Sequence, residues 1–186
     1  MLRRCGLVVL ARALAVAALA AQPSSLPSAS SMAMKSALES GVARIGEAGE
    51  KGFGAFATAR FEDGVTVADY VGEVLDAREI DARFHGKGVQ LPNDVAWLLS
   101  RKARGVGVTG DYIYSPGDGI FIDAEDPDAS NWCRFINHAA TDAPECNLRS
   151  KSLPFGMDGK PRIWFVSTRV IEPGDELLFD YGDTYW

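Results

Sequence analysis

The C-terminal residues 174–186, GDELLFDYGDTYW, bring aromatic and carboxylate side chains together in one short segment. Chain ends are commonly disordered unless they are tied into the fold, so these rings are expected to fill a core or line a pocket. Tyr181 follows Asp180 and precedes Gly182, an order that could hold a chemical group at a fixed angle. An ordinary core strand closed by two surface aromatic residues explains the segment equally well.

A second polar cluster lies at residues 131–147, NWCRFINHAATDAPECN. Asn137 and His138 end an apolar run and need partners, because buried amides and imidazoles are costly when unsatisfied. Taken alone, such a histidine is more often structural than a ligand or a base. Cys133, His138 and Cys146 could meet around a metal, but they lack the close ligand pairs and fourth ligand of a zinc site. No metal is therefore expected.

A glycine-rich segment at residues 44–54, RIGEAGEKGFG, places Phe53 between Gly52 and Gly54. Glycine permits positive φ and lets backbone N–H and C=O groups approach a ligand closely. An ordinary turn is an alternative for this segment. It lacks the longer pattern and the βαβ context of a dinucleotide site.

The composition favours one mainly β domain with extensions. The chain has 186 residues, of which 47% are hydrophobic and 24% charged, enough apolar material for one core. Nineteen Gly and nine Pro among many Val, Ile, Phe and Tyr favour short strands and turns over long helices. Three cysteines without a CxxC pair argue against a disulfide scaffold.

The charge is uneven along the chain. Residues 1–38 hold four basic and no acidic residues and so carry a charge of +4. Because the whole chain has a net charge of −6, residues 39–186 carry −10. An acidic body repels phosphate backbones and attracts cations. This predicts a Lys/Arg-rich peptide as partner and no direct nucleic-acid binding, although acidity that serves only solubility is a simpler alternative.

The first 31 residues are typical of a targeting segment, with a basic start, an Ala/Leu/Val run and a Ser/Pro stretch. Arg12 interrupts the apolar run, so a transit peptide for a chloroplast or mitochondrion fits as well as a secretory signal. The run is too short for a membrane span. Translation from Met32 or Met34 would instead leave little but the domain, and would be compatible with a nuclear protein.

Short strands and turns are expected to position these segments. Residues 55–59 and 65–71 predict two strands paired as a hairpin around the turn at 62–64, because Asp-Gly between apolar segments is a hairpin signal. Further strands are expected at 111–114, 120–123, 148–153 and 162–168. A Pro-Gly turn at 172–175 leads into the C-terminal segment.

Between residues 76 and 110 the pattern becomes helical. A short helix is expected over 77–84, and Asn93 could cap a second helix with an apolar face formed by Val95, Leu98 and Leu99. Three basic residues at the end of that helix are expected to interact only with the helix dipole and solvent: Arg101, Lys102 and Arg104.

Five segments, taken together and in this order, resemble the SET-domain lysine methyltransferases: GFG at 52–54, YVGE at 70–73, DYIY at 111–114, RFINH at 134–138 and ELLFDYGDTYW at 176–186. The resemblance covers about residues 40–186, after an N-terminal segment of residues 1–38, with 76–110 as a variable insert. It implies a mainly β fold with short helices, the SET-domain (β-clip) fold of small sheets, in which the C-terminal segment threads under a loop like a knot. RFINH and Tyr181 would then meet.

The resemblance also implies S-adenosylmethionine as methyl donor and a lysine side chain as acceptor. Residues that match cofactor contacts of the family are Gly52, Phe53, Gly54, Tyr112, Arg134, Asn137 and His138, and the aromatic residues that would pack on the adenine are Tyr185 and Trp186. The lysine channel matches Tyr70, Phe179 and Tyr181, with Tyr181 as the central catalytic tyrosine. Family members with Tyr at the place of Phe179 tend to stop at one methyl group, so Phe179 implies di- or trimethylation.

The chain departs from the family pattern in the loop after RFINH. Ala139 and Ala140 replace the usual small polar and Cys residues, and the loop is longer, so Asn147 is expected to match the second Asn of the family. No cysteine cluster flanks the domain, so zinc-bound flanking modules are not expected. The function implied is a protein-lysine methyltransferase of histone tails; the alternatives are a methyltransferase with an organelle substrate and a silent module that holds a basic peptide.

Overall fold

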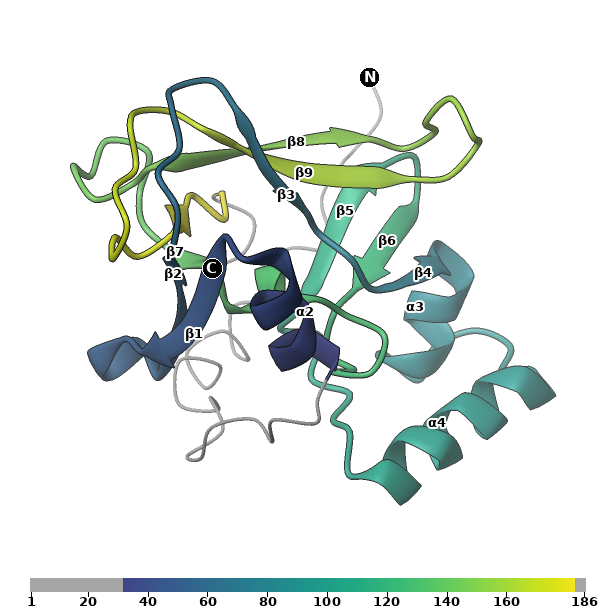
Figure 1. Ribbon diagram of the computed structural model, residues 1–186. Helices are drawn as coiled ribbons and strands as arrows, with labels where there is room; N and C mark the ends of the chain where they lie inside the picture. The colour runs from purple at the N-terminus through teal and green to yellow at the C-terminus, as the bar shows by residue number, and fades with distance from the viewer. Residues whose placement is uncertain (1–31, 183–186) are drawn as a thin grey trace.

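A computed structural model describes residues 32–182 of the chain (Figure 1). Residues 1–31 of the expected targeting segment, and residues 183–186 with the expected adenine contacts Tyr185 and Trp186, lie outside the described residues. Within residues 32–182, no helix has the length and apolar character needed to cross a membrane.

The described residues form short helices and strands. The helices are α2 (Met32–Ser40), α3 (Ala77–Arg83) and α4 (Pro92–Arg104), with 3-10 turns at η1 (Gly49–Lys51) and η2 (Trp132–Phe135). The strands are β1 (Ala43–Glu47), β2 (Phe53–Ala57), β3 (Thr66–Asp69), β4 (Glu73–Asp76), β5 (Ile113–Gly117), β6 (Ile120–Asp123), β7 (Asn137–His138), β8 (Leu148–Leu153), β9 (Arg162–Ser167) and β10 (Leu178–Phe179).

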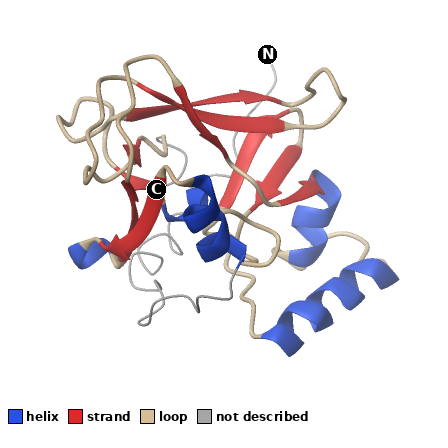
Figure 2. Ribbon diagram, viewed as in Figure 1, coloured by secondary structure: helices blue, strands red, loops and turns tan. Residues whose placement is uncertain are grey.

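The strands form three small sheets, which confirms the mainly β prediction (Figure 2). One sheet pairs β1 with β2, a second has the order β3-β9-β8-β10-β7, and a third has the order β4-β6-β5. The helices lie outside these sheets, with α3 and α4 together at one side of the molecule (Figure 2).

The C-terminal segment is inserted into the five-stranded sheet. Strand β10 lies between β7 and β8 and runs parallel to both. Leu178 is paired with Asn137, and Phe179 with His138 on one side and Leu148 on the other. The insertion therefore brings the C-terminal motif next to RFINH, as the resemblance implies.

The predicted hairpin of residues 55–59 and 65–71 is wrong. Strand β2 pairs with β1, and β3 pairs with β9 in a different sheet. The Asp-Gly turn does form, with Gly64 at a φ of 79°, but its amide donates to the carbonyl of Ser167 on β9 at 3.1 Å. The glycine-rich segment supplies β1 as an alternative partner for β2, so the local turn signal did not decide the pairing.

The main core surrounds η2. Trp132, Phe135 and Ile136 are buried there in one cluster with Phe53 of β2 and Phe165 of β9, which belong to two different sheets. Burial of each such side chain contributes about 1.5–3 kcal/mol. Helix α2 closes one side of this core: Ala37 is buried, and the hydroxyl of its neighbour Ser36 accepts a hydrogen bond from the backbone amide of Trp132.

The two expected helices of the insert exist, but the second begins differently from the prediction. Asp76 caps α3 through the amide of Glu79, whose carboxylate accepts the amide of Asp76 in return. Helix α4 has Leu91 in the cap position and Pro92 as its first residue, so Asn93 lies inside the helix and is not its cap.

Helix α4 also turns an unexpected side to the protein. Its buried side carries Asp94 and Arg101, whereas Val95 and Leu99 are exposed. The prediction that the basic residues at the end of this helix interact only with the dipole and solvent is therefore wrong for Arg101, and also for Arg104, which pairs with the carboxylate of Asp126 at 2.6 Å. The physical reason is that β4 and β6 present carboxylates to this helix, and a guanidinium is the group that can neutralise them when buried.

Candidate active site

Five aromatic rings from four segments of the chain meet between the five-stranded and three-stranded sheets. The centroid of Phe179 lies 4.7 Å from that of Phe165, 4.8 Å from Tyr181 and 6.3 Å from Tyr114. The ring of Tyr70 lies 6.1 Å from Tyr114 and 6.2 Å from Phe165. The structure thus brings together the three residues predicted to line a lysine channel, Tyr70, Phe179 and Tyr181.

The phenol groups of this cluster are fixed by hydrogen bonds. The Tyr70 hydroxyl donates to the carbonyl oxygen of Tyr112 at 2.7 Å, and the Tyr181 hydroxyl donates to the carbonyl oxygen of Ile136 at 2.8 Å. The Tyr114 hydroxyl pairs with that of Ser150 at 2.7 Å. Burial raises the pKa of Tyr70 well above its ordinary value. Tyr70 therefore stays a neutral phenol at physiological pH.

Tyr181 is tied to RFINH by its backbone as well. Its amide donates to Nδ1 of His138 at 3.2 Å, and the two rings lie 5.3 Å apart with their planes at 66°. Asp180, whose carboxylate lies 3.8 Å from the same Nδ1, accepts both the amide and the hydroxyl of Thr141. The hydrogen bonds from Thr141, followed by that from the Gly182 amide, lower the pKa of Asp180 below its ordinary value.

Asn137 joins the glycine-rich strand to the C-terminal segment. Its side-chain amide donates to the carbonyl oxygen of Phe53 at 3.1 Å and to the carboxylate of Glu176 at 2.9 Å. Lys51 pairs with the same carboxylate at 3.0 Å. A Cβ on Gly54 would lie 2.7 Å from that carboxylate and 3.1 Å from the Asn137 amide. Glycine is thus needed at position 54 because two protein groups, the Glu176 carboxylate and the Asn137 amide, lie close to its backbone.

The predicted cofactor residues Gly52 and Phe53 have structural roles of their own. Gly52 adopts a φ of 78°, in the region that favours glycine, and its amide donates to the carbonyl of Gly49. The ring of Phe53 is buried in the main core, so its backbone carbonyl is the part that reaches Asn137.

Arg134 and Tyr112 form a stacked pair. The guanidinium carbon of Arg134 lies 4.3 Å from the centroid of the Tyr112 ring and 5.5 Å from that of Phe135. Its Nε is buried and makes no hydrogen bond with any of the described residues. A buried N–H donor without an acceptor is costly, so this atom is a candidate contact for a polar ligand.

Asn147, which directly precedes β8, anchors the inserted strand β10. Its side chain donates to the carbonyl oxygen of Glu176 at 2.7 Å and accepts the amide of Leu178 at 2.9 Å, and the side chain is almost fully buried. These bonds hold β10 in register, and β10 carries Phe179.

Three residues of the site were not predicted from the sequence: Tyr114, Phe165 and Glu176. Tyr114 lies in the DYIY motif, two residues after Tyr112, and the alternation of side chains along a strand could have placed both rings near the site. For Phe165, the sequence of β9, in which it follows Trp164, gave no signal, because the aromatic partners of Phe165 come from distant segments.

The possible metal ligands do not form a group. Within residues 32–182, no three His, Cys, Asp or Glu side chains are arranged to hold a metal ion. Cys133 is buried beside the side chain of Asn131, and the sulfur of Cys146 lies near the carbonyl oxygens of Leu148 and Leu178.

A SET-domain family model matches residues 52–182, most of the chain. The chain belongs to the SET-domain family, and its sheets and inserted C-terminal strand form the SET fold. Related proteins include the histone-lysine N-methyltransferase Set2 of Drosophila melanogaster (28% identical, 74% of this chain and 5% of that protein) and ASHH3 of Arabidopsis thaliana (28% identical, 70% and 29%). The N-lysine methyltransferase KMT5A-A of Danio rerio is 30% identical over 72% of this chain and 33% of its own length.

Solved structures agree with these relatives. A crystal structure of an active polycomb repressive complex 2 in the stimulated state matches 75% of this chain and 15% of that chain, with 27% identity and a TM-score of 0.54. The Chaetomium thermophilum polycomb repressive complex 2 gives 26% identity and a TM-score of 0.51, over 76% of this chain and 15% of that chain. This chain spans a third or less of the length of these relatives.

Proposed function

We propose that this protein is an S-adenosylmethionine-dependent protein-lysine N-methyltransferase that acts on histone tails, with Tyr181 as the central catalytic residue. One observation carries the proposal. The Tyr181 hydroxyl is held on the carbonyl of Ile136, its amide on His138, and its ring against Phe179 in a cluster of five aromatic rings. The SET-domain match and the names of the relatives as lysine methyltransferases support the same activity.

The residues near RFINH suit S-adenosylmethionine, which carries a carboxylate, a ribose and an adenine. The unpaired Nε of Arg134 could donate to an oxygen acceptor, and the stacked Arg134–Tyr112 pair offers a flat surface. Asn137 and His138 would add polar contacts beside them. When bound, the cofactor supplies a methyl group on a sulfonium, which leaves as a neutral thioether.

The protein would contribute alignment and desolvation. A lysine amine has a pKa near 10.4, so it must lose its proton before it can attack the methyl carbon. The phenol oxygens of Tyr70 and Tyr181 donate their protons to backbone carbonyls, which leaves their lone pairs able to accept an N–H of the amine. The surrounding rings exclude water and tolerate a methylated ammonium through cation–π attraction.

The charge of the chain supports a basic substrate. Residues 39–186 carry −10, and histone tails are rich in Lys and Arg. Long-range attraction of this kind raises the rate of association and weakens as salt is added.

The test is transfer of radiolabelled methyl from S-adenosylmethionine by the full chain to core histones and, separately, to a cell lysate. Its Tyr181→Phe variant serves as the comparison, because it keeps the ring and loses the hydroxyl bonded to Ile136. Label on a histone that falls by about a hundredfold or more in the variant supports the proposal. Label only on organelle proteins of the lysate would move the substrate away from histones. Absence of label, together with absence of cofactor binding by calorimetry, would favour a silent peptide-binding module.

A further inference from the structure

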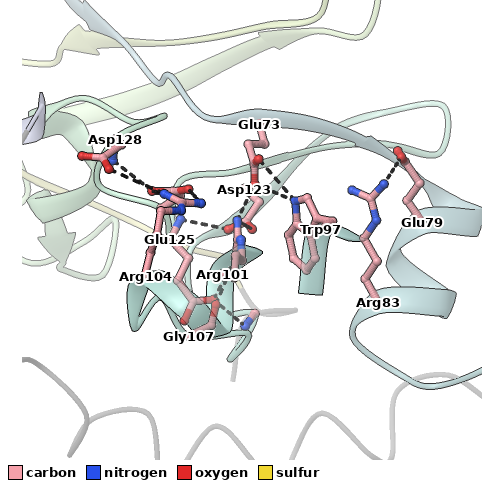
Figure 3. Close-up of polar contacts among 12 residues, drawn as sticks. Glu73, Glu79, Arg83, Trp97, Arg101, Arg104, Gly107, Asp123, Glu125 and Asp128 are labelled. Atoms are coloured by element: carbon pink, nitrogen blue, oxygen red, sulfur yellow. Dashed lines mark hydrogen bonds and ion pairs between the residues drawn. The ribbon is translucent and has the colours of Figure 1, made fainter. Parts of the chain in front are cut away.

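Arg101 of helix α4 is a buried charge surrounded by carboxylates. Its Nη2 donates to Glu73 at 2.5 Å and to Asp123 at 2.6 Å, and its guanidinium carbon lies 4.0 Å from the centroid of the Trp97 ring (Figure 3). Its Nη1 donates to the carbonyl oxygen of Gly107 at 3.1 Å and lies 3.8 Å from Glu125. A single guanidinium therefore holds several segments of chain at once.

Those segments converge on one atom, the carbonyl oxygen of Tyr112. From the segment that ends in Glu73, the Tyr70 hydroxyl donates to this oxygen at 2.7 Å. From the segment that follows Asp123, the amide of Ala124 donates to it at 3.1 Å. The third segment begins at Gly107 and leads to Tyr112 itself.

Residues 70–73 and the end of β6 are in close backbone contact. A Cβ on Gly72 would lie 2.4 Å from the carbonyl oxygen of Asp123, so residues 70–73 press directly on the end of β6. Asp123 is fixed from its other side as well, because its second oxygen accepts the amide of Glu125 at 2.9 Å. A displacement of the Asp123 carboxylate would therefore move the neighbours of the Tyr112 carbonyl.

We infer that Arg101 is a positioning residue for the lysine channel, which sets the Tyr70 hydroxyl through the carbonyl of Tyr112. This inference rests on the proposed methyltransferase function and assigns a catalytic purpose to the variable insert. Arg101 acts on Tyr70 and Tyr112 indirectly, through its hydrogen bonds with Glu73, Asp123 and Gly107. The planar fork of the guanidinium is essential, because a lysine ammonium cannot reach these three acceptors in the same geometry.

Arg83 offers a matched control within the same insert. Its side chain is largely buried, donates to Asp94 at 2.8 Å and to Glu79 at 2.5 Å, and lies over the Trp97 ring at 4.9 Å. Figure 3 shows Trp97 between the two arginines. The ionic partners of Arg83 are Glu79 on α3 and Asp94 on α4. Its link to Glu73 is indirect, through the Trp97 indole, which donates to Glu73 at 3.1 Å. Arg101, by contrast, bonds Glu73, Asp123 and Gly107 directly.

The experiment compares Arg101→Lys and Arg83→Lys in the full chain, with core histones as substrate. We expect Arg101→Lys to lower kcat by about tenfold or more with little change in KM, and to speed hydrogen exchange at the Ala124 amide. Arg83→Lys is expected to retain the wild-type kcat and the wild-type exchange rate at Ala124, even if its melting temperature falls by as much as that of Arg101→Lys. Equal loss of kcat in the two variants, or wild-type kcat in Arg101→Lys, would overturn the inference.

Two further measurements keep the inference testable. If circular dichroism shows that Arg101→Lys does not fold, Asp123→Asn replaces it, because this substitution removes the ionic partner of Arg101 and keeps the shape of the side chain. The kcat and the Ala124 exchange rate of Asp123→Asn are then compared with those of Arg83→Lys in the same way. Should the wild-type chain transfer no methyl group, the proposed function fails, but Ala124 exchange still reports on Arg101. Unchanged exchange in the folded variant would overturn the positioning role independently.

Discussion

The side-chain amide of Asn137 lies 2.9 Å from the carboxylate of Glu176 and donates a hydrogen bond to it. The same amide donates to the carbonyl of Phe53, so one side chain ties three distant segments of the candidate active site together. Gly54 passes directly over this junction, where a Cβ would lie 2.7 Å from the Glu176 carboxylate. The junction accordingly depends on a residue without a side chain.

Gly54→Ala is expected to lower the free energy of unfolding by about 1–3 kcal/mol, because the new methyl group must displace Glu176 or Asn137. Urea unfolding measures this loss. The double variant Gly54→Ala/Glu176→Ala should lose less than the sum of the two single changes, because the methyl group then occupies vacated space. Additive losses would show that the close approach does not limit the site.

Asn147→Ala should be among the more destabilising single substitutions, with a loss of about 3 kcal/mol. It leaves the buried amide of Leu178 and the carbonyl of Glu176 without partners. Urea unfolding again supplies the measurement. Asn93→Ala, at an exposed position of α4, is the control and should change stability by about 0.5 kcal/mol or less. A loss of similar size in both variants would contradict the anchoring role of Asn147.

The composition was sufficient to predict a β-rich fold, and the resemblance to the SET-domain family predicted that RFINH and the C-terminal segment meet. From the residues alone it followed only that each segment needs partners, because each combines polar groups with apolar residues. The pairing of the strands was harder to predict from the sequence. The Asp-Gly signal at Gly64 correctly marked a turn, yet β2 paired with β1, because local turn chemistry does not determine which distant strand completes a sheet.

Helix α4 shows why the remainder of the site could not be predicted. Its sequence carries Val95 and Leu99 on one side and Arg101 on the other, which ordinarily places the arginine in solvent. The opposite holds because Asp123, at the end of β6, is fully buried and Glu73, at the start of β4, is partly buried, and Arg101 pairs with both carboxylates. Such a pairing is a property of tertiary contacts and leaves no periodic pattern in the chain.

Phe179→Tyr is expected to shift the reaction toward monomethyl-lysine. Phe179 is almost fully buried between Phe165 and Tyr181, so an added hydroxyl would narrow the space that a methylated amine needs or hold a water molecule there. Mass spectrometry of the histone products distinguishes mono-, di- and trimethyl-lysine. A wild-type chain that makes only monomethyl-lysine, together with an unchanged variant, would refute this role of Phe179.

Asp94 should make the stability of the insert depend on pH in the acidic range. Hydrogen bonds from Arg78, then from the Leu91 amide and Arg83, hold its pKa far below the ordinary value of an aspartate. A depressed pKa contributes stability that is complete above the unfolded-state pKa of about 3.9 and is lost as the pH falls toward the folded-state value. The difference in urea midpoint between the wild-type chain and Asp94→Asn should therefore be large at pH 7 and smaller at pH 3.

Asp128→Asn, which removes an exposed partner of Arg104, is the control and should differ little from the wild-type chain in urea midpoint at either pH. A wild-type advantage over Asp94→Asn that stays constant between the two pH values would contradict the assignment of Asp94 as the ionised centre of the insert.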